Sequence, residues 1–149
     1  AGERKVVAYI GTQAFTRQLV EKSGYFVVQI PVVSQMATVL YAGGRSYAHA
    51  PDKNDTIPFF YQPEFDLPLV AGCAGWLVCK VMPYPDIQQQ HNLFMGDIVA
   101  AWSDDRVFRN GHWIFDDAPD ELRTVHYVAG GQFYAIGKGS KFDHGPGQD

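Results

Sequence analysis

The chain has 149 residues, of which 46% are hydrophobic and 14% aromatic, which is enough for one domain with its own core but short for two. Its formal net charge is −4 and no block of Lys or Arg stands out, so nucleic-acid binding has no electrostatic support. No uninterrupted apolar run is long enough to span a membrane, and the first residues lack the pattern of a signal peptide. Cys73 and Cys79 would lie about 20 Å apart on one strand, too far to bridge, and two lone thiols fit a reducing cytoplasm.

The first third of the chain predicts strand, helix and strand. Residues 5–10, KVVAYI, are apolar and predict a short strand. Residues 14–22 predict a helix with Thr12 as its N-cap and Ser23-Gly24 as its stop. Residues 25–31, YFVVQIP, are rich in aromatic and β-branched side chains and predict a second strand that ends at a proline.

The middle of the chain begins with a helix and a long polar connection. Ser34 can cap a short helix over residues 35–42, which Gly43-Gly44 would end. Residues 45–68 contain four prolines and several polar residues, which predicts loops and short extended pieces. From Leu69 to Met82 the pattern predicts one bent strand, with glycines at the bends.

Residues 91–103, HNLFMGDIVAAWS, form the longest predicted strand. Because side chains alternate faces, one set runs from Leu93 and the other from Asn92. Both sets are mostly apolar, so we expect both faces to be covered, as in a closed or nearly closed barrel. His91 would lie at the entrance of this strand, and Gly96 would permit a bend or a close backbone approach.

The last third predicts short strands joined by tight turns. Asn110-Gly111 is a strong hairpin signal between strands at 106–109 and 112–115, and a polar connection of one helical turn follows at 118–122. A second hairpin is predicted from strands at 124–128 and 132–136. We therefore expect a mainly β fold, a Greek-key β-barrel with two or three short helices, over residues 1–139, and a flexible tail over 140–149.

The turn from Gly11 to Arg17 is the first candidate site. A helix N-terminus offers free backbone N–H groups and the positive end of a dipole. Thr12, Gln13 and Thr16 add hydroxyl and amide donors, and Arg17 adds a charge. This group of donors predicts a phosphate site, and ordinary helix capping is the alternative interpretation.

His91 and Lys53 are the other polar candidates. His91 is interpreted either as a hydrogen-bond donor or proton relay at a pocket mouth, or as a surface histidine. Lys53, in the turn DKND, either reaches a phosphate or stays solvated. A metal site from His91, His112 and His126 stays open, although no close His-x-His spacing supports it. The motifs of Rossmann cofactor folds, P-loops and serine hydrolases are absent from the sequence.

Four segments, taken in order, resemble a known family. They are TRQLVEKSGYFVVQIP at 16–31, LVAGCAGWLVCKV at 69–81, HNLFMGDIVAAWSDD at 91–105 and VHYVAGGQFYAIGK at 125–138. Together they resemble the flavin reductase-like family with the FMN-binding split barrel, which includes the flavoredoxins. HNLFMGDIVAA is the most specific of the matches.

The resemblance implies an FMN cofactor and a set of contacts to it. Thr16 matches a residue that helps to hold FMN, Lys53 matches the lysine of a flavin-contacting turn, and His91 matches a histidine near the isoalloxazine. Tyr127 lies where the family can place an aromatic residue beside the flavin. Family members are typically homodimers with FMN near the subunit interface.

The resemblance also implies a function, with alternatives. Members pass electrons from NADH or NADPH to flavin, or act as FMN-carrying electron-transfer proteins that work with a redox partner protein. A split-barrel dimer that has lost flavin binding is a further alternative. Members usually have roughly one or two more strands before the equivalent of Lys5, and we expect these strands to be missing here. Gln89-Gln90-His91 replaces the Gly-Asp-His of some reductases, which favours the electron carrier slightly.

Overall fold

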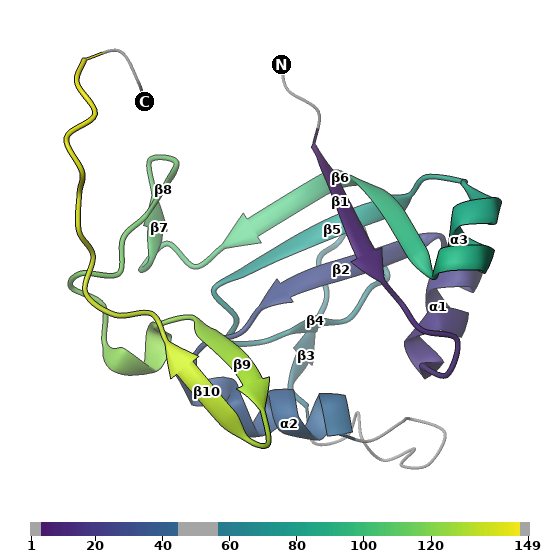
Figure 1. Cartoon of the computed structure of the whole chain (residues 1–149), viewed down its shortest axis with the longest axis horizontal. Helices are drawn as coiled ribbons and strands as arrows, with labels where there is room; N and C mark the ends of the chain where they lie inside the picture. The colour runs from purple at the N-terminus through teal and green to yellow at the C-terminus, as the bar shows by residue number, and fades with distance from the viewer. Residues whose placement is uncertain (1–3, 45–56, 147–149) are drawn as a thin grey trace.

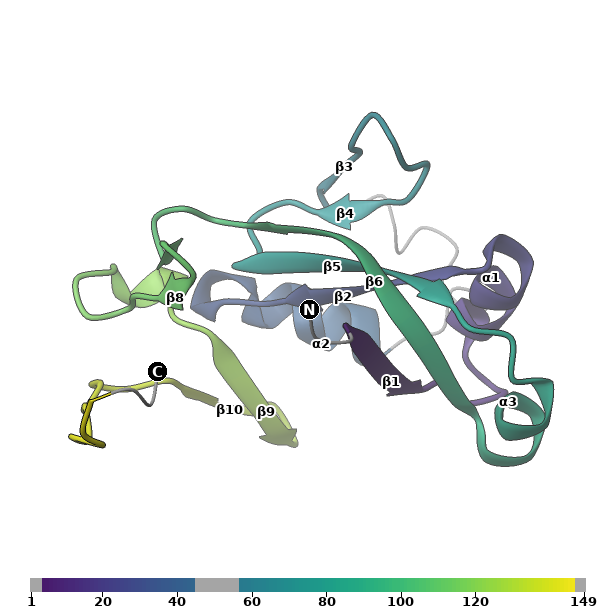
Figure 2. The ribbon, with the colours of Figure 1, turned by 90° about the horizontal axis from the view of Figure 1, so that it is seen from above.

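The computed structural model describes residues 4–44 and 57–146, so the predicted turn at Lys53 lies outside the described residues. Its centre is a four-stranded antiparallel sheet with the strand order β1-β6-β5-β2. The sheet curls into a half-barrel (Figures 1 and 2), in agreement with the predicted mainly β fold. Its strands are β1 (Lys5–Tyr9), β2 (Tyr25–Ile30), β5 (Gly75–Val81) and β6 (Leu93–Ser103).

Three α-helices and two 3₁₀ turns accompany the sheet in the described residues. They are α1 (Phe15–Ser23), η1 (Val33–Gln35), α2 (Met36–Gly44), α3 (Pro85–His91) and η3 (Asp120–Leu122). The stop predicted for the first helix is confirmed, because Gly24 takes the left-handed conformation at a φ of 77°. The predicted N-cap is wrong: Ala14 occupies that position, and no side chain bonds the first turn of α1. Ser34 is likewise not an N-cap, because it lies inside η1, which leads directly into α2 at Met36.

Short strand pairs complete the fold. They are β3 (Phe59–Phe60) with β4 (Leu69–Val70), β7 (Phe108–Arg109) with β8 (His112–Trp113), and β9 (Val125–Ala129) with β10 (Gln132–Ala135). Both predicted hairpins are confirmed, with positive φ at Asn110-Gly111 and at Gly130-Gly131. The single strand predicted over 69–82 is instead two, because the chain turns at Gly72, where φ is 98°.

Strand β6 holds the sheet together, with β1 on one side and β5 on the other. The close approach predicted at Gly96 is confirmed, because a Cβ built there would lie 2.8 Å from Cys79 Cβ and 2.9 Å from Phe26 Cε1. The strand begins at Leu93 and not at His91, since His91 is the last residue of α3. The Gln-rich stretch before it is therefore helical.

The expectation that both faces of β6 are covered is wrong. Val99 is 47% exposed. It has no partner in β5, because the adjacent residues Val78 and Cys79 pair with Ala100 and Ile98, which skips Val99. This one-residue irregularity shifts the alternation of side chains, since directly opposed residues share a face. Ala101 opposes Leu77, which packs with the Phe94 core, so Ala101 lies on the Phe94 face and not on the Leu93 face.

The buried side chains form three clusters around the sheet. The first joins α1 to the sheet and contains Val20, Phe26, Cys79 and Phe94; the second contains Val32, Ala74, Val107 and Leu122; the third contains Leu69, Cys73 and Trp76. The first cluster fixes α1 against the end of the sheet where α3 also lies (Figure 1). Within the described part of the chain, every helix is too short or too polar to cross a lipid bilayer.

Candidate functional site

The turn between β1 and α1 offers hydrogen-bond donors to a ligand. Thr12 and Gln13 are exposed in this turn, and Thr16 is exposed in the first turn of α1. No side chain caps α1, and its first turn carries no acidic residue, so the positive end of its dipole is not offset there. This set of donors fits an anionic group such as a phosphate.

Arg17 departs from its prediction as a charge facing that phosphate. It is only 4% exposed, and its guanidinium lies 4.8 Å from the centre of the Phe94 ring. Its nitrogens donate instead to protein oxygens, namely Glu21 Oε1 at 3.0 Å, the Ile10 carbonyl at 2.8 Å, Asn92 Oδ1 at 2.9 Å and the Gln88 carbonyl at 3.0 Å. Arg17 therefore joins α1 to the end of β1 and to the α3–β6 junction.

The α3–β6 junction lies directly beside this turn. Asn92 adopts the left-handed conformation at a φ of 58°, and its N–H donates to the Gln88 carbonyl at 3.1 Å, which ends α3. The Asn92 carbonyl in turn accepts a hydrogen bond from the Ile10 N–H at 2.9 Å. His91, exposed at the end of α3, is thereby brought to the same corner of the molecule as Thr12 and Thr16.

Tyr9 also belongs to this corner, and the sequence analysis did not single it out. Its side chain is 71% exposed, and its hydroxyl accepts a hydrogen bond from Asn92 Nδ2 at 3.4 Å. Its ring lies against Gly11, since a Cβ built on Gly11 would be 3.7 Å from Tyr9 Cε1. The sequence signal that could have identified Tyr9 is its place as the last residue of an apolar strand, directly before the turn Ile10-Gly11-Thr12. The corner site is therefore defined as Tyr9, Thr12, Gln13, Thr16 and His91.

Tyr127 is not brought to the corner site within one chain. It lies on β9, 45% exposed, with its ring 4.9 Å from that of Phe133 and its hydroxyl accepting from the Gly131 N–H at 3.3 Å. The β9–β10 hairpin lies apart from α1 and α3 in both ribbon views (Figures 1 and 2).

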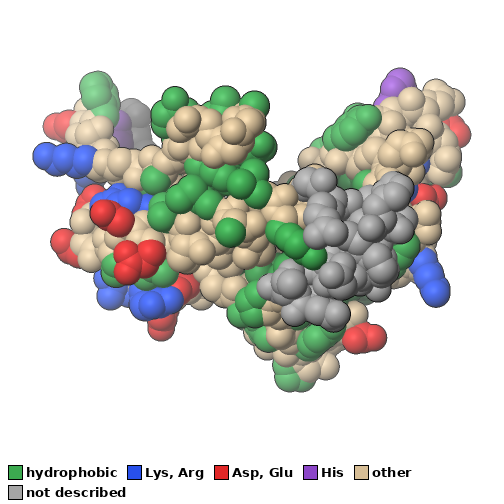
Figure 3. Space-filling view, turned by 90° about the horizontal axis from the view of Figure 1, so that it is seen from below, with side chains coloured by type: hydrophobic (Ala, Val, Ile, Leu, Met, Phe, Trp, Pro, Cys, Tyr) green, Lys and Arg blue, Asp and Glu red, His purple; other side chains and the backbone are tan. Residues whose placement is uncertain are grey.

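A cleft of about 920 Å³ lies beneath that hairpin. Its lining combines apolar and charged side chains. The apolar ones include Val33, Met36 and Phe133, from η1, α2 and the hairpin, and the charged ones include Asp116, Arg123 and Lys138. Arg123 bonds to Asp120 at 3.3 Å and to the Gly137 carbonyl at 3.2 Å. Figure 3 shows a different hollow, a notch between the lobe of the β9–β10 hairpin and the lobe of α1 and α3, with hydrophobic side chains gathered beside it. The residues given for the cleft include none from α1 or α3.

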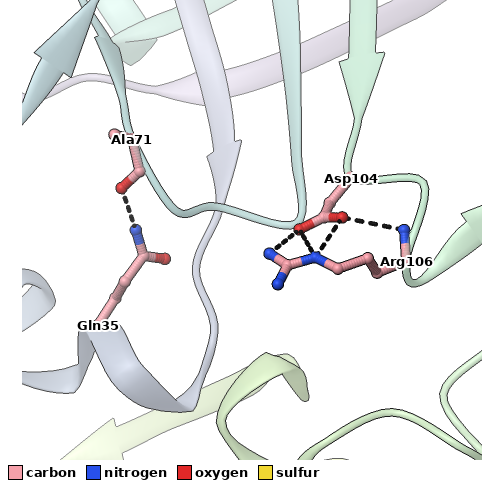
Figure 4. A network of polar contacts seen from close by, with 4 residues as sticks. All are labelled: Gln35, Ala71, Asp104 and Arg106. Carbon is pink, nitrogen blue, oxygen red and sulfur yellow. Dashed lines mark hydrogen bonds and ion pairs between the residues drawn. The ribbon is translucent and has the colours of Figure 1, made fainter.

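Figure 4 shows two sets of polar contacts, around Gln35 and around Asp104, that stabilise the fold. Gln35 is 7% exposed; its Oε1 accepts from the Val32 N–H at 3.1 Å, and its Nε2 donates to the Ala71 carbonyl at 3.0 Å. The guanidinium of Arg106 donates to the Asp104 carboxylate at 2.7 to 3.2 Å and holds the pKa of Asp104 below its ordinary value. In each set the side-chain donors and acceptors bond to other groups of the protein, which indicates a structural role.

In the described residues, the two cysteines are not activated as nucleophiles, and no group of side chains suits a metal ion. Cys73 and Cys79 are free and buried, and burial raises the pKa of both thiols, against an opposing hydrogen bond from Gln35 at Cys73. Raised thiol pKa values disfavour the reactive thiolate. Across residues 4–44 and 57–146, no three His, Cys, Asp or Glu side chains are grouped closely enough to hold a metal ion.

Comparison with known proteins identifies the family. Residues 5–127 match the family described as "Flavin reductase like domain". The chain belongs to the flavin reductase-like family. Membership confirms the resemblance expected from the four sequence segments.

Similar proteins support this assignment. The chain is 34% identical to YddH of Escherichia coli (strain K12) over 137 residues, which cover 90% of this chain and 71% of that protein. It is 42% identical to an FMN-binding domain of a flavin reductases-like enzyme from Shewanella baltica OS155, with a TM-score of 0.89 over 93% of this chain and 74% of that one.

More distant solved structures share the fold. Flavoredoxin from Desulfovibrio vulgaris (Miyazaki F) has a TM-score of 0.74 at 17% identity, covering 97% of this chain and 76% of its own. The NADH:FAD oxidoreductase of Streptomyces globisporus C-1027 has a TM-score of 0.61 at 17% identity, covering 89% of this chain and 69% of its own. These likenesses confirm the predicted split-barrel fold.

Proposed function

We propose that this protein binds FMN at the corner site and is an oxidoreductase that passes electrons from NADH or NADPH to the flavin. The observation that carries the proposal is the uncapped N-terminus of α1, with three exposed donor side chains and no acidic residue in its first turn. The similarity to an FMN-binding domain at 42% identity supports the choice of cofactor.

Each residue of the proposal has a defined task. Thr12, Gln13 and Thr16 donate hydrogen bonds to the FMN phosphate, together with the backbone N–H groups at the start of α1. His91 donates a ring N–H to the edge of the flavin and can hold a proton at that atom. Lys53, outside the described residues, stays a contact implied by the family. Tyr127 contributes only if a second copy of the chain brings it to the corner.

The proposed reaction needs no reactive side chain from the protein. Bound FMN supplies the electron-accepting and electron-donating chemistry, so no side-chain nucleophile is required. The protein binds the phosphate, orients the ring and limits the access of water.

An FMN-carrying electron-transfer protein is the second candidate. The exposed Gln89 and Gln90 before His91 favour it, because no carboxylate stands there to help position a nicotinamide. Such a protein would exchange electrons with a redox partner protein and would oxidise NADH or NADPH only slowly. A split-barrel dimer without flavin is the third.

We also propose that two copies associate in the cytoplasm. On the face of β1 and β6 away from the Phe94 core, Val7 is 57% exposed and Val99 is 47% exposed. Among the described residues, β1 is an edge strand of the sheet. Apolar side chains on an unpaired edge favour association with another chain. The two free, buried thiols support a reducing compartment.

The absorption spectrum of the purified protein tests these functions. FMN bands in the purified protein, or after addition of FMN and removal of the excess, would support the cofactor. Bleaching of those bands by NADH or NADPH within catalytic times would support the oxidoreductase, whereas a yellow protein that reacts only with a reduced protein partner would support the electron carrier. A protein that stays colourless with added FMN would refute both.

Replacement of Thr16 tests the phosphate contact. Thr16→Ala removes one exposed hydroxyl, and we expect FMN binding to weaken by about 1–2 kcal/mol, as titration of FMN fluorescence would measure. Ser34→Ala, which removes an exposed hydroxyl from η1, is the matched control and should leave the affinity unchanged. Equal affinities of Thr16→Ala and wild type would remove Thr16 from the site.

A further inference from the structure

Three side chains form a directed chain of hydrogen bonds that ends at the corner site. The buried Arg17 donates to Asn92 Oδ1 at 2.9 Å, and Asn92 Nδ2 donates to the Tyr9 hydroxyl oxygen at 3.4 Å. The exposed fraction of the side chains rises from 4% at Arg17 to 71% at Tyr9, and Asn92 between them is half-buried. A buried cation is thus connected to an exposed phenol through one carboxamide.

The chemistry of these groups sets the direction of every bond. A guanidinium has five donors and no acceptor, so the Asn92 oxygen must face Arg17. The Asn92 amide nitrogen, which can only donate, then faces Tyr9, and the phenol oxygen must accept. The Tyr9 O–H proton is therefore not used in this series of hydrogen bonds, and among the described residues it is available to a ligand.

We propose that Tyr9 is a ligand-binding residue of the corner site, and that its O–H donates to an acceptor oxygen of the flavin nucleotide. This inference rests on the proposed FMN function and adds to it a contact that does not come from α1 or from His91. Arg17 and Asn92 act as positioning residues, because they fix which way the Tyr9 hydroxyl points without reaching the ligand.

The surroundings of Tyr9 hold it in place for this role. Its ring rests against Gly11, one residue before Thr12. The backbone on both sides is fixed, since the Ile10 N–H donates to the Asn92 carbonyl at 2.9 Å and Tyr9 pairs with Leu93 across β1 and β6. An exposed donor that is already oriented loses little conformational freedom when a ligand binds.

Tyr9→Phe tests the contact by removing only the hydroxyl. We expect the FMN dissociation constant to rise roughly five- to tenfold in fluorescence titration, the range for one lost hydrogen bond. The matched control is Tyr61→Phe, which removes the hydroxyl of a tyrosine that is 58% exposed between β3 and β4. The control should bind FMN as the wild type does, and an unchanged affinity of Tyr9→Phe would overturn the proposal.

Asn92→Asp tests the direction of the bonds. Aspartate tolerates the left-handed backbone of position 92, and its carboxylate still accepts from Arg17, so we expect the melting temperature to be kept or raised. The carboxylate would also accept the Tyr9 proton and turn it away from the ligand, so FMN affinity should fall as in Tyr9→Phe. A variant that melts like the wild type and keeps full affinity would overturn the directional role of Asn92.

The double variant separates this mechanism from simple charge repulsion. If the Tyr9 proton is the link, Tyr9→Phe with Asn92→Asp should bind FMN about as well as either single variant. If the two substitutions instead weaken FMN binding by independent factors that multiply, the new charge acts by itself. That result would overturn the link through the Tyr9 proton. If the wild-type protein binds no FMN, the proposed function fails and this inference with it; if it binds FMN and Tyr9→Phe binds equally well, only this inference fails.

Discussion

Arg17 is a buried cation whose donors are used by the protein itself. The sequence predicted a charge at the phosphate turn, because Arg17 follows Thr16 at the start of a helix. The side chain instead turns inward over the Phe94 ring and donates to the carbonyls of Ile10 and Gln88. Its direction depends on which acceptors the fold brings near, and these lie as far as 75 positions away in the sequence.

Replacement of Arg17 should therefore affect stability first. Arg17→Met keeps much of the apolar stem but removes the side-chain donors to the Ile10 carbonyl, the Gln88 carbonyl and Asn92 Oδ1, and among the described residues only the Gln88 carbonyl of the two keeps another donor, the Asn92 N–H. We therefore expect a loss of about 2–4 kcal/mol in the free energy of unfolding by urea. Arg109→Met, at an exposed position on β7, is the control and should change stability by less than about 0.5 kcal/mol. Equal stabilities of the two variants would show that the Arg17 network contributes little.

At the scale of elements, local sequence signals and long-range pairing contribute differently to β6. Its approximate span and the role of Gly96 follow from the sequence, because a glycine between bulky strand residues indicates a close approach. The irregularity at Val99 does not, because nothing in residues 98–100 marks it. It arises from the register that β5 imposes on β6, and it reverses the face on which later side chains lie.

Gly96→Ala tests the packing of this element. The new Cβ would lie 2.8 Å from Cys79 Cβ and 2.9 Å from the Phe26 ring, so β6 must shift or its neighbours must move. We expect a loss of about 1–3 kcal/mol in unfolding free energy, measured by urea titration. Gly43→Ala, in α2, is the control: outside the helix's own backbone, the new Cβ has no neighbour within 4 Å among the described residues. This control should be neutral or slightly stabilising, and a Gly96→Ala protein as stable as the control would contradict the packing.

At the scale of the whole molecule, the half-barrel leaves apolar side chains exposed. Val7 and Val99 lie on the same outer face of β1 and β6, on the side opposite the Phe94 cluster. The coverage of both faces of β6, which the sequence analysis expected from a closed or nearly closed barrel, would have buried them. In the described residues the sheet ends at β1 and β2 as its two edges.

Val7→Lys tests the proposed association of two copies. A charge on the outer face of β1 should weaken the dimer, so we expect the wild type at about twice the chain mass and the variant largely at the single-chain mass in size-exclusion chromatography with light scattering. Leu40→Lys, at a 41% exposed position on α2, is the control and should remain dimeric. A monomeric wild-type protein would refute the association.

The sequence by itself determined the family, the mainly β class, both hairpins and the stop of α1. These follow from local causes: glycine and asparagine accept positive φ, β-branched and aromatic runs favour strands, and an ordered set of segments identifies relatives. It also placed Thr12, Gln13, Thr16 and His91 among the candidates.

Only the tertiary structure decided how these candidates lie together. It turned Arg17 inward, separated Tyr127 from the corner, and brought Tyr9 beside Asn92 and the α1 turn. The physical reason is that each of these outcomes depends on a contact between distant segments, such as the Arg17–Asn92 and Asn92–Tyr9 hydrogen bonds. A polar side chain points toward the acceptors or donors that the fold supplies, and local sequence does not contain them.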